Sequence, residues 1–81
     1  MGGEEFILIV PNTDLQDAQK LAEKIRHAIE GYSFKEIGHK TASFGISTFN
    51  KGDTKESLVK RADEALYKAK NNGRNRIEVI N

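Results

Sequence analysis

The segment from Phe6 to Val10 constrains the fold most, because it is apolar at all five positions. A strand with no polar side to turn toward water belongs inside a sheet, where both of its faces are covered. We therefore predict an interior strand from Glu5 to Val10 that ends at Pro11-Asn12. The same run is too short to cross a bilayer, so the sequence predicts no membrane contact by this segment.

A helix is predicted after this strand. Leu15 to Ile29 carries apolar residues at helical spacing. The pattern Thr13-x-x-Gln16 is typical of a capping box at the helix start, and Gly31 is predicted to end the helix in the left-handed conformation.

Two more strands and a second helix follow. Residues 33–37 are predicted as a short strand, Gly38-His39-Lys40 as a turn, and Thr41 to Phe49 as an alternating strand. Asp53 or Thr54 is expected to cap a helix that turns its apolar side, Leu58 to Ala69, inward. With a last strand over residues 76–80, the predicted order is β-α-β-β-α-β.

Composition narrows the classes of protein. A chain of 81 residues with 37% hydrophobic and 31% charged residues fits one soluble, folded domain. It has no cysteine and two histidines, which excludes disulfides and thiolate zinc sites. The net charge is +1, with an acidic excess before residue 50 and a basic excess after it. We expect a cytoplasmic protein.

The first residues, Gly2-Gly3-Glu4-Glu5-Phe6, resemble the signature of the GGDEF family, the diguanylate cyclases, in its GGEEF spelling. The resemblance continues through Val10-Pro11-Asn12-Thr13 and the strand Ser43–Ser47. It is densest from Lys60 to Asn75, and order and spacing agree over all 81 residues.

The resemblance implies a fold and a domain boundary. Residues 1–81 resemble the C-terminal half of a GGDEF domain, so we expect a partial domain that lacks the upstream half, with its metal-binding aspartate and guanine-reading residues. The implied fold is α+β, a β-α-β-β-α-β fragment of a nucleotide-cyclase-like (ferredoxin-like) antiparallel sheet with two helices.

The resemblance also implies site residues. Glu4 is expected to hold Mg²⁺ and, with Glu5 in a secondary role, to be catalytic, since Mg²⁺ prefers hard oxygen ligands. Successive strand residues point to opposite faces, so the two carboxylates should face apart. Gly2 and Gly3 would let GTP approach the backbone, although a hairpin turn alone could also require them.

In the second helix, Lys70 and Arg74 are expected to grip the GTP phosphates, because arginine offers a fork of donors and lysine a point charge. Favourable interaction with the helix dipole is the simpler explanation for basic residues there. Asp63 and Tyr67 are predicted to be a buried or half-buried structural pair. A solvated basic face is predicted for Lys60, Arg61, Lys68 and Arg76.

The predicted function is part of a diguanylate cyclase domain, which condenses two GTP into cyclic di-GMP with Mg²⁺. The chain alone is expected to be inactive and to bind GTP weakly. A non-catalytic GTP- or partner-binding GGDEF-like module is the alternative. An RNA-binding module is rejected, because Ile46 stands where a base-stacking aromatic is needed.

In the fold that the resemblance implies, an upstream strand that is missing here lies between the strands at Phe6–Val10 and Thr41–Phe49. Its loss should leave open edges, which favour pairing with another chain. We expect a homodimer or other association of chains. Direct parallel pairing of the two strands across the first helix is the alternative.

Overall fold

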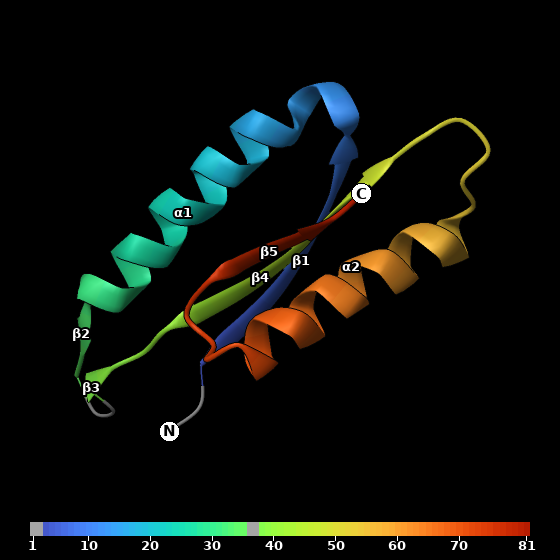
Figure 1. The fold of residues 1–81 in the computed structure, drawn as a ribbon. Helices are drawn as coiled ribbons and strands as arrows, with labels where there is room; N and C mark the ends of the chain where they lie inside the picture. The colour runs from blue at the N-terminus through green and yellow to red at the C-terminus, as the bar shows by residue number, and fades with distance from the viewer. Residues whose placement is uncertain (1–2, 36–37) are drawn as a thin grey trace.

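A three-stranded sheet with one helix on each face forms the centre of the protein (Figure 1). The structure is a computed structural model that describes residues 3–35 and 38–81. The sheet contains strands β1 (Glu4–Pro11), β4 (Ala42–Phe49) and β5 (Ile77–Ile80). Helices α1 (Leu15–Gly31) and α2 (Lys55–Asn71) run along its two faces, which gives a molecule of 46 × 22 × 18 Å.

The sheet is parallel, and the expectation of an antiparallel sheet is therefore wrong for these strands. Its order is β1-β4-β5, and both pairs are parallel. The reason lies in the connections, because a helix between two neighbouring strands returns the chain to the end where the first strand began. Helix α1 makes this crossover between β1 and β4, and α2 makes it between β4 and β5. The α+β class with two helices is confirmed.

A small antiparallel pair accounts for the remaining strands. Strand β2 (Ser33–Phe34) pairs with β3 (Gly38–His39). The predicted turn at residues 38–40 is thus partly a strand, because Gly38 and His39 pair with Phe34 and Ser33. The predicted short strand over residues 33–37 extends beyond the described residues at positions 36–37.

Strand β4 is the centre of the core. Residues 42 to 48 are buried, and the predicted alternation of its faces is confirmed. Phe44 and Ile46 pack with Ala22 of α1 in one cluster. On the other face the Ser47 hydroxyl donates a hydrogen bond to the carbonyl oxygen of Leu58 in α2, at 3.0 Å.

The other face of β4 approaches α2 so closely that it requires glycine. A Cβ atom on Gly45 would lie 2.4 Å from the carbonyl oxygen of Ala62 and 2.4 Å from the amide nitrogen of Leu66. Both are backbone atoms, which cannot rotate away as a side chain can. Small residues continue this contact along α2, where Ala62, Ala65 and Ala69 are fully buried.

Strand β1 is an edge strand in the described part of the chain, contrary to the interior position predicted for it. Its ladder partner is β4, in the register Glu4↔Ala42 to Pro11↔Phe49. Phe6 is 39% exposed and stacks on Phe44 with ring centroids 5.0 Å apart, whereas Ile7 and Ile9 are 39% and 36% exposed on the α2 face. The apolar run identified the strand correctly, but its second edge and part of each face remain open.

The helix ends agree with the sequence patterns only for α2. Thr54 caps α2 in a reciprocal pair with Ser57, as one of the two candidates predicted. Before α1, a short 3₁₀ helix, η1 (Asn12–Asp14), replaces the capping box, and the Thr13 hydroxyl donates to Asp14 instead of accepting from a backbone amide. Gly31 is the last helical residue of α1, not a left-handed cap, because the chain continues into an extended Tyr32.

Candidate functional site

The C-terminal end of α2 places Lys70 and Arg74 beside each other. Helix α2 ends in a Schellman motif, in which the Arg74 amide donates to the Ala69 carbonyl at 2.8 Å and the Gly73 amide to the Lys70 carbonyl at 3.5 Å. Gly73 has the left-handed φ of 119° that this motif requires. Arg74 then follows in the left-handed region as well, with φ 62°. The turn therefore keeps Arg74 close to the last turn of the helix.

Glu5 lies opposite this pair of cations. One of its carboxylate oxygens, Oε2, is 3.5 Å from Lys70 Nζ and 3.6 Å from Arg74 Nη1. All three side chains are accessible, at 41%, 33% and 53% exposure respectively. At the start of β1, two cations thus surround one carboxylate. We call this cluster of Lys70, Arg74 and Glu5 the Glu5 site. Lys70 and Arg74 are thus brought together as the sequence suggested.

Glu4 lies on the opposite face of the sheet. It is the register partner of Ala42, whose face is covered by α1, and its carboxylate forms an ion pair with Lys40. The ammonium of Lys40 also lies 5.6 Å from the ring centroid of Phe34. The prediction that Glu4 and Glu5 face apart is confirmed. Of the two carboxylates, it is Glu5, expected to be secondary, that the structure places beside Lys70 and Arg74.

Gly3, directly before β1, has a structural requirement of its own. The Glu4 amide donates to the Thr41 carbonyl at 2.8 Å, and a Cβ atom on Gly3 would lie 2.8 Å from the same oxygen. Gly3 therefore permits the close approach of β1 to the start of β4. Gly2 lies outside the described residues, so its predicted contact with GTP stays a prediction.

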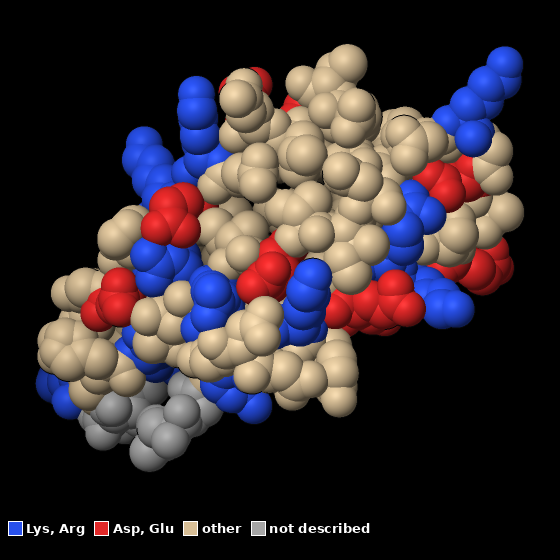
Figure 2. Space-filling model, viewed as in Figure 1, with Lys and Arg blue, Asp and Glu red and all other residues tan. Residues whose placement is uncertain are grey.

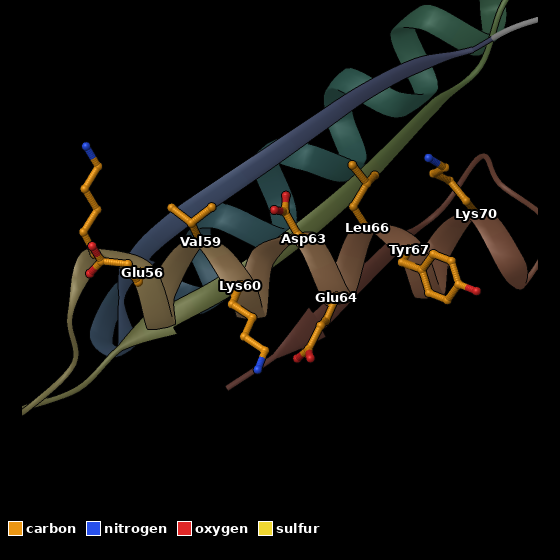
Figure 3. A pocket seen from close by; sticks show the side chains of 9 residues that line it. Glu56, Val59, Lys60, Asp63, Glu64, Leu66, Tyr67 and Lys70 are labelled. Atoms are coloured by element: carbon orange, nitrogen blue, oxygen red, sulfur yellow. The ribbon is translucent and has the colours of Figure 1, made fainter.

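An open groove of about 920 Å³ runs along α2 and reaches the Glu5 site at Lys70 (Figure 3). Val59, Asp63 and Leu66 point to the side of the helix where β1 runs, and Lys70 follows at the end of the row (Figure 3). Figure 2 shows acidic and basic side chains interspersed, without a large area of one sign on the face in view. The surface of the groove is mainly apolar, and charged side chains of both signs line it along the length of α2.

The described carboxylates do not form a metal site by themselves. No cluster of three or more acidic or histidine side chains occurs within residues 3–35 and 38–81. Mg²⁺ can be held by one carboxylate together with phosphate oxygens and water. Glu5 fits that arrangement, because Lys70 and Arg74 beside it could hold the phosphates. Glu4, which was expected to be the metal ligand, has Lys40 as its partner on the other face.

Two arginine networks were not anticipated from the sequence. Arg61, expected on a solvated face, donates to both oxygens of Asp53, at 2.9 and 2.8 Å, and to the Thr48 carbonyl at 2.7 Å. These hydrogen bonds from Arg61, with one from the Asn50 amide, hold the pKa of Asp53 well below its usual range. In the sequence, this ion pair could have been expected only from the eight-residue separation of Asp53, just before the helix, and Arg61, within it. This network lies at the N-terminal end of α2, away from the Glu5 site.

The second network joins α1 to the turn after α2. Arg26, whose side chain is 12% exposed, donates to the side-chain oxygen of Asn75 at 2.8 Å and binds Glu23 through two further hydrogen bonds. Hydrogen bonds from Arg26 lower the pKa of Glu23. Periodicity carries no signal for this contact, because 49 residues separate its members.

Asp63 and Tyr67 do not form the structural pair that was predicted. Both side chains are exposed, and Tyr67 is 66% accessible. They line the open groove and point in different directions from α2 (Figure 3). Their spacing of one helical turn was therefore not enough to indicate burial.

Comparison with known proteins gives one family. Residues 1–76 match the profile of the family described as diguanylate cyclase, GGDEF domain. The chain is 48% identical over 82 aligned residues to the response regulator PleD of Caulobacter vibrioides and to the diguanylate cyclase VdcA of Vibrio cholerae. It is 43% identical over 76 residues to the diguanylate cyclase DgcM of Escherichia coli.

These relatives are much longer than the chain. Each alignment covers 94% of the chain but 18% of PleD, 24% of VdcA and 18% of DgcM. No solved structure matches. Among the described residues, no helix has the length and apolar character needed to span a membrane.

Proposed function

Because the chain belongs to the GGDEF family, we propose that it is part of a diguanylate cyclase domain that joins two GTP molecules into cyclic di-GMP. In this reaction the 3′-hydroxyl of each GTP attacks the α-phosphate of the other, and pyrophosphate leaves. Such a transfer depends mainly on positioning and on neutralising the charge of the phosphates. The observation that carries the proposal is the Glu5 site, where two cations and a carboxylate meet at the family signature.

Lys70 and Arg74 are the proposed phosphate ligands, together with the Gly2-Gly3 turn. Both cations are accessible, and arginine and lysine side chains donate charge-assisted hydrogen bonds to phosphate oxygens. Without nucleotide, the Glu5 carboxylate pairs with these two cations, so an incoming phosphate must displace it. The chain is therefore proposed to bind GTP weakly, and we expect titration calorimetry to show no submicromolar, guanine-selective binding.

Both carboxylates of the signature stay proposed catalytic residues. Glu5 faces the proposed phosphate site and is the carboxylate that fits a Mg²⁺ site there, whereas Glu4, proposed from the family resemblance as the Mg²⁺ ligand, lies on the other face. For Glu4 to serve in that role, its ion pair with Lys40 must open. Mg²⁺, when bound, would neutralise phosphate charge, and further oxygen ligands would come from phosphates, water or residues beyond those described.

The 81-residue chain alone is proposed to make no cyclic di-GMP. Its described residues present one signature carboxylate to each face of the sheet, and it spans only 18–24% of the relatives named above. Incubation with GTP and Mg²⁺, followed by chromatography, tests this. Formation of product that Glu4→Ala abolishes would contradict it.

Association of chains is part of the proposal. Strand β1 has an open edge in the described structure, and Phe6, Ile7 and Ile9 are each more than a third exposed along it. An open apolar edge favours pairing with another strand, so we propose a homodimer. Sedimentation at micromolar concentration tests it, and a monomer with a single sharp unfolding transition would contradict it. A cytoplasmic location stays a prediction.

The alternative function is a GTP- or partner-binding GGDEF-like module without catalysis. The accessible groove along α2 favours it, because it offers an apolar surface next to the proposed phosphate site. The two functions differ in their product. A protein that includes this chain and binds GTP without releasing pyrophosphate would support the binding module.

A further inference from the structure

We propose that Arg26 is a positioning residue for the phosphate-binding side chain of Arg74, and that it acts through Asn75. This inference rests on the proposed function, since it assigns Arg74 to the phosphates. Arg26 belongs to α1, which lies across the sheet from α2, and is 49 residues from Asn75 in the chain. It would thus connect the helix on one face to the proposed site on the other.

The turn that carries Arg74 has an unusual backbone. Arg74 and Asn75 have φ of 62° and 52°, and they are the non-glycine residues with positive φ in the described chain. Two consecutive left-handed residues are disfavoured for side chains with a Cβ atom, and they persist where surrounding contacts hold them. Glycine tolerates positive φ at position 73, but the positive φ of Arg74 and Asn75 needs another explanation.

The contacts that hold this turn converge on Asn75. Arg26 Nη1 donates to its side-chain oxygen at 2.8 Å and to its carbonyl oxygen at 3.4 Å. The side-chain amide of Asn75 donates to Glu30 at 2.7 Å, and the backbone amide of Asn75 donates to the Ser43 hydroxyl at 3.1 Å. Asn75 is therefore fixed by α1 and by β4, whereas Arg74 itself is free to face Glu5.

Arg26 is in turn fixed in place. Its guanidinium binds both oxygens of Glu23, at 3.0 and 2.6 Å, and Glu30 at 3.4 Å. Its donors thus hold carboxylates of α1 as well as Asn75 in the turn after α2. A lysine could not make the same set of bonds, because it has one ammonium and no planar fork.

The test compares Arg26→Met with Arg61→Met. Both substitutions remove a partly buried arginine that binds a carboxylate and a backbone carbonyl, but Arg61 does so at the other end of α2. Binding of inorganic triphosphate is measured by calorimetry under conditions where each protein is folded. We expect about tenfold weaker binding for Arg26→Met, the effect of losing one charge-assisted hydrogen bond, and unchanged binding for Arg61→Met.

A double-mutant cycle separates positioning from a general loss of structure. In a chain with Arg74→Gln, which keeps a long side chain at the left-handed position, Arg26→Met should cause no further loss of affinity. If Arg26→Met weakens binding equally with and without Arg74, or does not weaken it in the wild-type background, the proposal is wrong. Asn75→Gly removes the side-chain hydrogen bonds of Asn75 to Arg26 and Glu30 while tolerating positive φ. If Arg26→Met does not fold, Asn75→Gly takes its place in the test and should weaken triphosphate binding in the same way.

A readout independent of the ligand keeps this inference separate from the proposed function. If the wild-type chain binds no triphosphate, the proposed phosphate site is wrong, but the positioning of Arg74 can still be measured. The chemical shifts of Arg74 and Asn75 report their left-handed φ. We expect them to change in Arg26→Met and to be kept in Arg61→Met. Unchanged shifts in Arg26→Met would overturn the role of Arg26.

Discussion

Glu5 occupies the cations that the proposed site needs for phosphate, so removing its charge should tighten anion binding. In Glu5→Gln the side chain keeps its length, while Lys70 and Arg74 lose a carboxylate at 3.5 and 3.6 Å. The pairs are exposed, and an exposed ion pair contributes about 0.2–1 kcal/mol. The two ion pairs together therefore weaken the binding of an added anion by roughly 0.4–2 kcal/mol, which corresponds to about 2- to 25-fold in affinity.

Calorimetric titration with inorganic triphosphate, in the presence of a chelator that removes divalent cations, measures this gain. Glu56→Gln is the matched control, because it makes the same change of charge on an exposed residue at the far end of α2. It should leave the affinity unchanged. The gain in Glu5→Gln should also shrink as salt is added, since exposed charges are screened.

Weaker or unchanged binding in Glu5→Gln would refute this reasoning. It would mean that Lys70 and Arg74 do not receive the anion, or that Glu5 does not compete with it. An equal gain in Glu56→Gln would instead attribute the effect to net charge rather than to the Glu5 site.

Two further predictions concern the fold. Gly45→Ala should lower the free energy of unfolding by about 3 kcal/mol, because its Cβ atom would meet α2 backbone atoms at 2.4 Å. Gly31→Ala, which has open space around it, should raise the free energy of unfolding by up to about 1 kcal/mol. Urea denaturation measures both changes, and equal behaviour of the two variants would contradict the reasoning. Asp53 has a lowered pKa in the folded state, so its ionised form stabilises the fold above its ordinary pKa of 3.8, and this contribution is lost as pH falls below that value. The difference in stability between the wild type and Asp53→Asn, measured by urea denaturation, should therefore be present near neutral pH and decline in acid, whereas a constant difference would contradict it.

Part of the candidate site could be predicted because it follows from positions close together in the chain. The four-residue separation of Lys70 and Arg74 at a helix end brought the two cations together. Strand alternation correctly placed Glu4 and Glu5 on opposite faces. The choice between the two carboxylates could not be made this way, because it depends on which face of β1 the helix α2 covers.

The edge position of β1 shows a similar limit. An apolar run reports that a strand prefers burial on both faces, and it does so whether or not another strand is present to complete the sheet. In the described structure β4 pairs with one edge of β1, and Phe6, Ile7 and Ile9 stay partly exposed. The prediction was therefore right about the strand and wrong about its surroundings.

The sequence by itself determined the order of the principal strands and helices, the faces of β4 and the family of the chain, because periodicity and motif spacing are properties of nearby residues. Only the tertiary structure decided that the sheet is parallel, that Glu5 meets Lys70 and Arg74, and that Arg26 reaches Asn75. These features depend on the direction in which α1 and α2 cross the sheet and on the register that results. Contacts between residues as far apart as Arg26 and Asn75 are fixed by that packing, and no local pattern records them.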